Sequence, residues 1–284
     1  MTLWRDGELV AADGAVSADD RGWLVGDAVF ETMLVDGGAP AFLDRHLARM
    51  ELGCSVLGIV RNLDADELRA AIATLARNKA LPGRAVCRLT LSRSGGPRGL
   101  APHPSAQPRL YVSLVPAAAP PPHLHLVVSN RRRWTGASTN DFKCSGAYAE
   151  NVLARADAVS RGAGEAIMLN EHGRVACASS ANLFVSAGAY VLTPALNEGA
   201  MPGVVRSILL EEAAALRIEC QEVRMSQSDL RRGEILLTNS VAGVVRSALD
   251  GLPPPESGET AARLIAAYAR RLANEFSARS GGLA

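Results

Sequence analysis

A cluster of prolines constrains the fold more than any other feature of the chain, because it interrupts regular structure near the middle. Pro116 and the triplet Pro120–Pro122 are separated only by alanines. Proline fixes its φ angle and has no backbone N–H, so this stretch cannot continue a helix or a central strand. Residues 116–122 are therefore predicted to form an extended connector. It joins a small N-terminal α/β domain, residues 1–115, to a larger C-terminal domain, residues 123–284.

Both parts of the chain carry helix-like and strand-like patterns. Apolar residues at helical spacing predict helices over residues 43–57, 67–78, 148–159, 204–216 and 261–276. Period-two alternation and short apolar runs predict strands over residues 29–35, 39–42, 85–91, 109–114, 166–170, 181–185 and 235–237. The predicted fold class is α+β, with two subdomains and mixed sheets.

Composition and generic motifs exclude several classes of protein. The net charge of +1 provides no field for a polyanion, so no nucleic-acid partner is expected. No apolar run reaches the roughly 18 to 20 residues of a membrane span, and the N-terminus lacks the apolar centre of a secretory signal. The five cysteines are scattered without a CxxC pair, which favours a reducing, cytoplasmic setting. His123 and His125 alone do not predict a metal site, and neither a P-loop nor a GxSxG elbow is present.

Lysine is rare in this chain, so very few residues could supply a reactive amine. Of thirty basic residues, only Lys79 and Lys143 are lysines. Lys143 lies between Phe142 and Cys144, where a partly desolvated amine becomes nucleophilic toward carbonyl groups, as Schiff-base chemistry requires. By itself this position fits an ordinary lysine beside an apolar strand better than a catalytic one. Lys79 is placed near a helix end, where a surface cation is favoured.

Polar groups elsewhere suit a phosphate. Gly203 follows Pro202 and opens a predicted helix, so the backbone N–H groups of Val204 and Val205 point out of a positive dipole end. Hydroxyl and amide donors stand near predicted strand ends, at Ser179, Ser180, Thr238, Asn239 and Ser240.

Together these residues resemble the class IV aminotransferases, which are fold-type IV pyridoxal-phosphate enzymes. That group includes branched-chain and D-amino-acid aminotransferases and 4-amino-4-deoxychorismate lyase. The resemblance rests on five blocks in the family's order and spacing, at residues 20–32, 43–50, 143–158, 164–184 and 193–206. It implies a homodimer that binds pyridoxal 5′-phosphate between the small and the large domain and acts on a small-molecule substrate.

The resemblance also implies residue roles. Lys143 is expected to bind the cofactor aldehyde and then to act as the general base that moves the α-proton. Arg49, from an HxxR motif, is expected to grip the phosphate. The expected cofactor-binding set is Arg49, Lys143, Cys177, Ser179, Ser180, Gly203, Val204, Val205 and Ser240.

The chain departs from the family pattern most clearly at Cys177. The family usually has a glutamate there, which pairs with the pyridine nitrogen of the cofactor. A neutral thiol is a weak donor and cannot replace that carboxylate. The electron sink is therefore expected to be weaker, unless Cys177 is a thiolate or another residue takes over. Gly146 replaces a usual asparagine, Val205 a usual threonine and Ala28 a usual glycine.

Two blocks favour the lyases within the family. Residues 91–100 are similar to the SRGxGxRG stretch of aminodeoxychorismate lyases, and Leu237–Ser240 to their TNS block. Guanidinium groups pair bidentately with carboxylates, so Arg93 and Arg98 are expected to meet a substrate that bears two of them. The expected substrate residues are Phe30, Thr32, Arg93, Arg98 and Asn239.

The predicted function is a lyase that converts 4-amino-4-deoxychorismate to p-aminobenzoate and pyruvate. The first alternative is an aminotransferase for D-amino or branched-chain amino acids. The second is a module that binds the cofactor without catalysis, against which the intact Lys143 argues.

Overall fold

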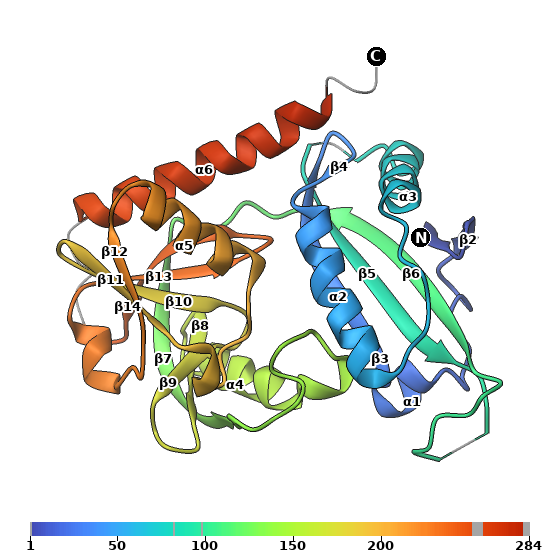
Figure 1. The fold of residues 1–284 in the computed structure, drawn as a ribbon, viewed down its shortest axis with the longest axis horizontal. Coiled ribbons are helices and arrows are strands. Elements are labelled where there is room, and N and C mark those ends of the chain that lie inside the picture. The colour runs from blue at the N-terminus through green and yellow to red at the C-terminus, as the bar shows by residue number, and fades with distance from the viewer. Residues whose placement is uncertain (1, 82, 98, 252–257, 281–284) are drawn as a thin grey trace. The chain divides into compact units, whose positions relative to one another are not determined.

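The computed structural model describes residues 2–81, 83–97, 99–251 and 258–280, and it divides into two compact units (Figure 1). The first unit comprises Met1–Ala118, Asp141–Tyr148 and Asn274–Ala284. The second comprises Ala119–Asn140 and Ala149–Ala273. The chain thus passes between units near Ala118 and returns to the first for the short segment that contains Lys143.

The first unit is built on an antiparallel sheet. Its strand order is β2(Glu8–Ala11), β1(Thr2–Arg5), β6(Gln107–Pro116), β5(Ala85–Ser94), β3(Ala28–Asp36), β4(Ala39–Pro40). Every pair in this order is antiparallel, so the mixed pairing expected of the sheets is confined to the second unit. The helices are α1(Arg21–Val25), α2(Leu43–Leu57) and α3(Ala65–Asn78).

Helices α2 and α3 cover one face of this sheet (Figure 1). Leu43, Leu47 and Met50 recur at helical spacing along α2 and are buried in a core shared with the sheet. The Asp64 carboxylate accepts hydrogen bonds from the N–H groups of Asp66 and Glu67, which fixes the start of α3. Side chains alternate along β3, so Met33 faces the helices and Phe30 and Thr32 face the opposite side.

The second unit is built on a mixed sheet. Its strand order is β12(Glu219–Val223), β11(Tyr190–Pro194), β10(Asn182–Ala187), β13(Glu234–Asn239), β14(Gly243–Leu249), β7(His123–Arg133), β8(Glu165–Asn170), β9(Val175–Ala178). Strand β7 runs parallel to both of its neighbours, and β11 runs parallel to β12. Its helices are α4(Ala149–Ser160), α5(Val204–Ala215) and the part of α6(Glu259–Ser280) that precedes Asn274. The 3-10 turns η2(Leu196–Glu198) and η3(Gln227–Arg231) also lie in this unit, whereas η1(Ser145–Ala147) belongs to the first.

Helix α4 buries its alanine side. Ala154 and Ala158 pack with Val127, Ala166 and Met168 of the sheet, because small side chains let the helix lie close to the strands. The residues that form an apolar side in the sequence face outward instead: Val152 is 64% and Val159 63% exposed. In the described part of the chain, no helix has the length and apolarity needed to span a membrane.

Candidate active site

The Lys143 segment runs beside the start of β3. The Phe30 N–H donates to the Lys143 carbonyl at 2.9 Å, and Val29 and Cys144 form an isolated antiparallel bridge. Phe142 and Cys144 point into the core of the first unit, where a Cβ on Gly53 would lie 2.6 Å from the Phe142 ring. Since side chains alternate in extended backbone, Lys143 points away from that core, toward Phe30.

Two aromatic rings flank the Lys143 amine. Nζ lies 5.1 Å from the centre of the Phe30 ring and 5.3 Å from that of Tyr148, and it donates to the Tyr148 hydroxyl at 2.9 Å. The rings themselves are 5.1 Å apart and tilted by 55°. This arrangement partly desolvates the amine and fixes its direction. The role of Tyr148 was not predicted from the sequence, although its place five residues after Lys143 was a usable signal.

Arg88 belongs to the same group of side chains and was also missed. It pairs with Thr32 across β3 and β5, and its guanidinium carbon lies 3.8 Å from the centre of the Phe30 ring. Cys87 and Leu89 face α2 and α3, so the exposed Arg88 lies on the opposite face with Phe30 and Thr32. One face of the sheet therefore presents an amine, a phenol and a guanidinium together.

Two glycines approach closely where the Lys143 loop meets the end of α1: the contact excludes a side chain at Gly26, whereas a Cβ on Gly146 would make only ordinary contacts of 3.4 Å or more. Gly26 has a φ of 72°, and a Cβ added there would lie 2.4 Å from the Cα of Gly146. The Gly146 N–H donates to the Gly26 carbonyl at 3.2 Å. The loop that carries Lys143 is thus held against the end of α1 by backbone contact.

Arg49 is held by a buried carboxylate. Its Nε lies 2.7 Å from Glu31 Oε1 and its Nη2 2.8 Å from Oε2, a bidentate pair. His46 Nδ1 lies 2.7 Å from Glu31 Oε2. Burial alone raises the pKa of Glu31, but the Arg49 charge and the hydrogen bonds from His46 and Arg49 outweigh it and hold that pKa at about 2. Burial lowers the pKa of His46. Neither Glu31 nor His46 was predicted to belong to the site.

Arg93 is bound into the scaffold. Its Nε donates to Asp27 at 2.8 Å, Nη1 to the Gly58 carbonyl at 3.0 Å, and Nη2 to the Leu57 carbonyl. The side chain is 9% exposed, and each guanidinium nitrogen already has a protein partner in place of a substrate carboxylate.

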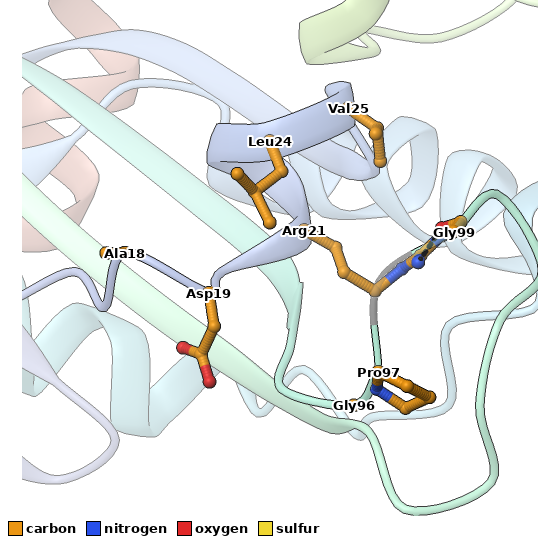
Figure 2. Close-up of a pocket in the computed structure, with 8 residues that line it drawn as sticks. All are labelled: Ala18, Asp19, Arg21, Leu24, Val25, Gly96, Pro97 and Gly99. Carbon is orange, nitrogen blue, oxygen red and sulfur yellow. Dashed lines mark hydrogen bonds between the residues drawn. The ribbon is translucent and has the colours of Figure 1, made fainter.

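Residues 18–25, which include α1, and the loop after β5 enclose a cavity of about 380 Å³ (Figure 2). Arg21 reaches across it to the carbonyls of Gly99 and Leu100, at 2.7 and 2.8 Å, and also binds Asp27. The lining residues are Ala18, Asp19, Arg21, Leu24, Val25, Gly96, Pro97 and Gly99. The other predicted substrate arginine, Arg98, lies outside the described residues.

In the second unit, Cys177 is a neutral, buried thiol. Burial raises its pKa, the Arg133 charge lowers it and the Glu165 charge raises it further. The two serines that follow are bound to Glu165: Ser180 donates to this carboxylate at 2.6 Å, and Ser179 donates to its other oxygen. Glu165 also accepts the Ala166 N–H at 2.8 Å and pairs with Arg155 at 3.2 Å. A carboxylate with four donors has little capacity left for a further one.

The remaining predicted cofactor residues meet at one end of the second sheet. Gly203 caps α5 without a side-chain acceptor, and a Cβ there would lie 2.0 Å from Asn182 Oδ1. Asn182 is also paired with Thr238, next to the turn that holds Asn239 and Ser240. The N–H groups of Val204 and Val205 begin α5, so this end of the sheet fits a phosphate. Asn239 Oδ1 is occupied by the N–H groups of residues 241 and 242, at 3.0 and 2.7 Å.

Comparisons with known proteins place the chain in one family. The family model described as amino-transferase class IV matches residues 28–249. Aminodeoxychorismate lyase of Bacillus subtilis (strain 168) is 28% identical over 283 residues, covering 95% of this chain and 94% of that protein. Branched-chain-amino-acid aminotransferase of Salmonella typhimurium is 25% identical over 268 residues, 88% of this chain and 85% of that protein. The solved branched-chain aminotransferase of Thermoproteus uzoniensis with norvaline has the same fold, with a TM-score of 0.87, 23% identity and coverage of 98% and 96%.

Proposed function

Because the chain belongs to the class IV aminotransferases, a family of enzymes that use pyridoxal 5′-phosphate, we propose that it is an aminodeoxychorismate lyase. It would convert 4-amino-4-deoxychorismate to p-aminobenzoate and pyruvate. The observation that carries this choice is the similarity to the B. subtilis lyase, which extends over 95% of the chain. The lyase-like blocks at residues 91–100 and 237–240 support it. The site of action proposed for the enzyme is the cytoplasm.

The residues proposed in each unit, taken separately, fit one part of the cofactor. Lys143 would bind its aldehyde, and Arg49, the N–H groups of Val204 and Val205 and the Ser240 hydroxyl would hold its phosphate, with Gly203 leaving room. When bound, the cofactor supplies an electron sink that stabilises negative charge on the substrate carbon. Cys177 is proposed to lie near the ring. The hydroxyls of Ser179 and Ser180 both donate to the Glu165 carboxylate, so these serines would influence the cofactor only through Glu165.

Lys143 and Tyr148 would move the proton. A free lysine amine can take the α-proton of the substrate and return it later. Tyr148 is 2.9 Å from Nζ, so its hydroxyl accepts a hydrogen bond from the ammonium form and can donate one to the neutral form. This single hydrogen bond would keep the amine aimed at the reacting carbon in both states. The Phe30 and Tyr148 rings limit the access of water.

Arg88 is proposed to bind a substrate carboxylate. It is exposed on the face of the sheet that also carries Phe30, Thr32 and Lys143, and stacking on the Phe30 ring leaves its Nη groups available at the edge of the guanidinium. Arg93 cannot do this without giving up its three scaffold bonds. Phe30 and Thr32 would line the substrate beside Arg88. Arg98 and the amide nitrogen of Asn239 remain proposed substrate contacts.

An aminotransferase for branched-chain or D-amino acids is the second candidate. It is favoured by the similarity to the Salmonella aminotransferase over 88% of the chain. The Lys143, Tyr148 and Arg88 group also suits a substrate with one amino group and one carboxylate.

Product identity decides between the two. The enzyme is incubated with 4-amino-4-deoxychorismate, and p-aminobenzoate and pyruvate are measured by chromatography. Equal amounts of both support the lyase. If neither forms, while leucine or D-alanine transfers its amino group to a 2-oxo acid, the aminotransferase is the correct function. Lys143→Ala is expected to abolish either reaction, and Lys79→Ala serves as the matched control.

A homodimer is proposed from the exposed side of α4. Val152, Leu153 and Val159 are 64%, 43% and 63% exposed. Monomeric proteins rarely leave a group of large apolar side chains exposed to water on one helix. Antiparallel pairing with a second copy, centred between Arg155 and Ala156, places Val152 of one copy opposite Val159 of the other, so that the exposed valines contact each other. Light scattering is expected to give the dimer mass for the native chain and a monomer for Val152→Glu. Val60→Glu, at a valine that is 89% exposed, should remain dimeric. A native monomer refutes the proposal.

A further inference from the structure

Three side chains form a continuous hydrogen-bonded row in the first unit. His46 contacts Glu31, and Glu31 holds Arg49 with both carboxylate oxygens, over distances of 2.7, 2.7 and 2.8 Å. His46 and Glu31 are completely buried, whereas Arg49 is 8% exposed. Only the arginine can therefore reach a ligand, and the histidine can act only through the carboxylate.

The protonation of this row follows from its geometry. Glu31 is ionised, since its neighbours hold its pKa at about 2, so both of its oxygens are acceptors. His46 Nδ1 must then carry the hydrogen. The opposite nitrogen, Nε2, is buried and has no hydrogen-bond partner among the described residues. Protonating it would bury an unpaired N–H, so the neutral tautomer with hydrogen on Nδ1 is the stable form.

We propose that His46 is a positioning residue for the cofactor phosphate. The bond from Nδ1 fixes the plane of the Glu31 carboxylate, and that plane fixes the fork of the Arg49 guanidinium. Without this donor the carboxylate can rotate, and the guanidinium loses its set direction. This inference rests on the proposed role of Arg49 at the phosphate.

Two similar amides separate positioning from general structural support. In His46→Asn the amide nitrogen lies near the position of Nδ1 and keeps the donor to Glu31. In His46→Gln it lies near the position of Nε2 and loses that donor. Both variants remain polar and differ by one methylene group. The apo-protein of each is titrated with pyridoxal 5′-phosphate and with pyridoxal, which lacks the phosphate, and binding is followed by absorbance.

The diagnostic quantity is the dissociation constant for pyridoxal divided by that for pyridoxal 5′-phosphate. This ratio measures how much the phosphate group contributes to binding, and it falls when the phosphate contact is weakened. His46→Gln is expected to lose at least about tenfold in affinity for pyridoxal 5′-phosphate, the effect of one charge-assisted hydrogen bond, with pyridoxal binding unchanged. His46→Asn should keep the native ratio. Equal ratios in the two variants, or a parallel loss for both ligands, overturns the proposal.

A further variant distinguishes this failure from that of the proposed function. Arg49→Gln should lower the same ratio, and an unchanged ratio refutes the phosphate role of Arg49 and the inference with it. The ratio is measured without turnover, so whether the product is p-aminobenzoate or an amino acid does not affect it.

Discussion

Replacement of Glu31 by glutamine is predicted to destabilise the first unit by about 3 kcal/mol. The pKa of Glu31 moves from its ordinary 4.5 to about 2 in the folded chain, and each pKa unit corresponds to about 1.4 kcal/mol of differential interaction. Glutamine has the same size but cannot balance the Arg49 charge. The loss of one member of a buried ion pair costs roughly 3–5 kcal/mol, which agrees with that value.

Urea denaturation followed by fluorescence measures this loss, because Trp4 is buried in the same core. Glu8→Gln is the matched control, since Glu8 is exposed on strand β2. A carboxyl group whose pKa is lower in the folded state stabilises the fold above its unfolded pKa and ceases to do so as the pH falls toward the folded one. The difference between the native chain and Glu31→Gln should thus be constant above pH 4.5 and shrink as the pH falls toward 2. A difference below about 1 kcal/mol at neutral pH, or one independent of pH, refutes this account of the pair.

Three further predictions concern the face of the sheet that carries Lys143. Tyr148→Phe keeps the ring contact but removes the hydroxyl bound to Nζ, so kcat should fall about tenfold while the cofactor stays attached; an unchanged kcat contradicts the role of Tyr148. Arg88→Gln should raise KM for the carboxylate substrate at least about tenfold, Arg88→Lys less, and Arg77→Gln on the exposed side of α3 not at all; a fall in kcat alone would place Arg88 elsewhere. Gly26→Ala should abolish cofactor attachment, because the new Cβ would lie 2.4 Å from Gly146. Gly14→Ala is the matched control, since Gly14 has a similar φ of 74° but no neighbour within 4 Å, and it should leave attachment intact. Equal losses in the two variants would show that backbone strain, and not the contact with Gly146, is the cause.

Local patterns were sufficient to predict several elements. Helix α2 has the predicted bounds, Leu43–Leu57, because Leu43, Leu47 and Met50 repeat at helical spacing. Two short strands were not predicted: β2 has only four residues, and β12 is mostly polar, so neither is long or apolar enough to be distinguished from a loop by its own sequence. The buried side of α4 was not evident either. Its buried residues are alanines, while its larger apolar residues are exposed.

Site residues were predictable where a motif marks them and not where only the fold joins them. The order of the sequence blocks singled out Lys143 and Arg49. The carboxylate that holds Arg49 comes from residue 31, on another element, and no pattern in the α2 sequence reveals it. Arg93 and Arg98 look alike in the sequence, since both lie in the glycine-rich stretch of residues 91–100. Only the folded chain brings Asp27, which is 66 residues away, against Arg93.

The attachment of the cofactor to Lys143 is the central claim, and borohydride reduction tests it most directly. Reduction of the holoenzyme makes the bond between amine and cofactor permanent, and peptide mapping by mass spectrometry then identifies the modified lysine. Because the chain has only two lysines, the result has two informative outcomes. The account predicts a single label on Lys143 and none in Lys143→Ala. A label on Lys79, whose amine donates to the Leu114 carbonyl at 2.8 Å, would contradict it.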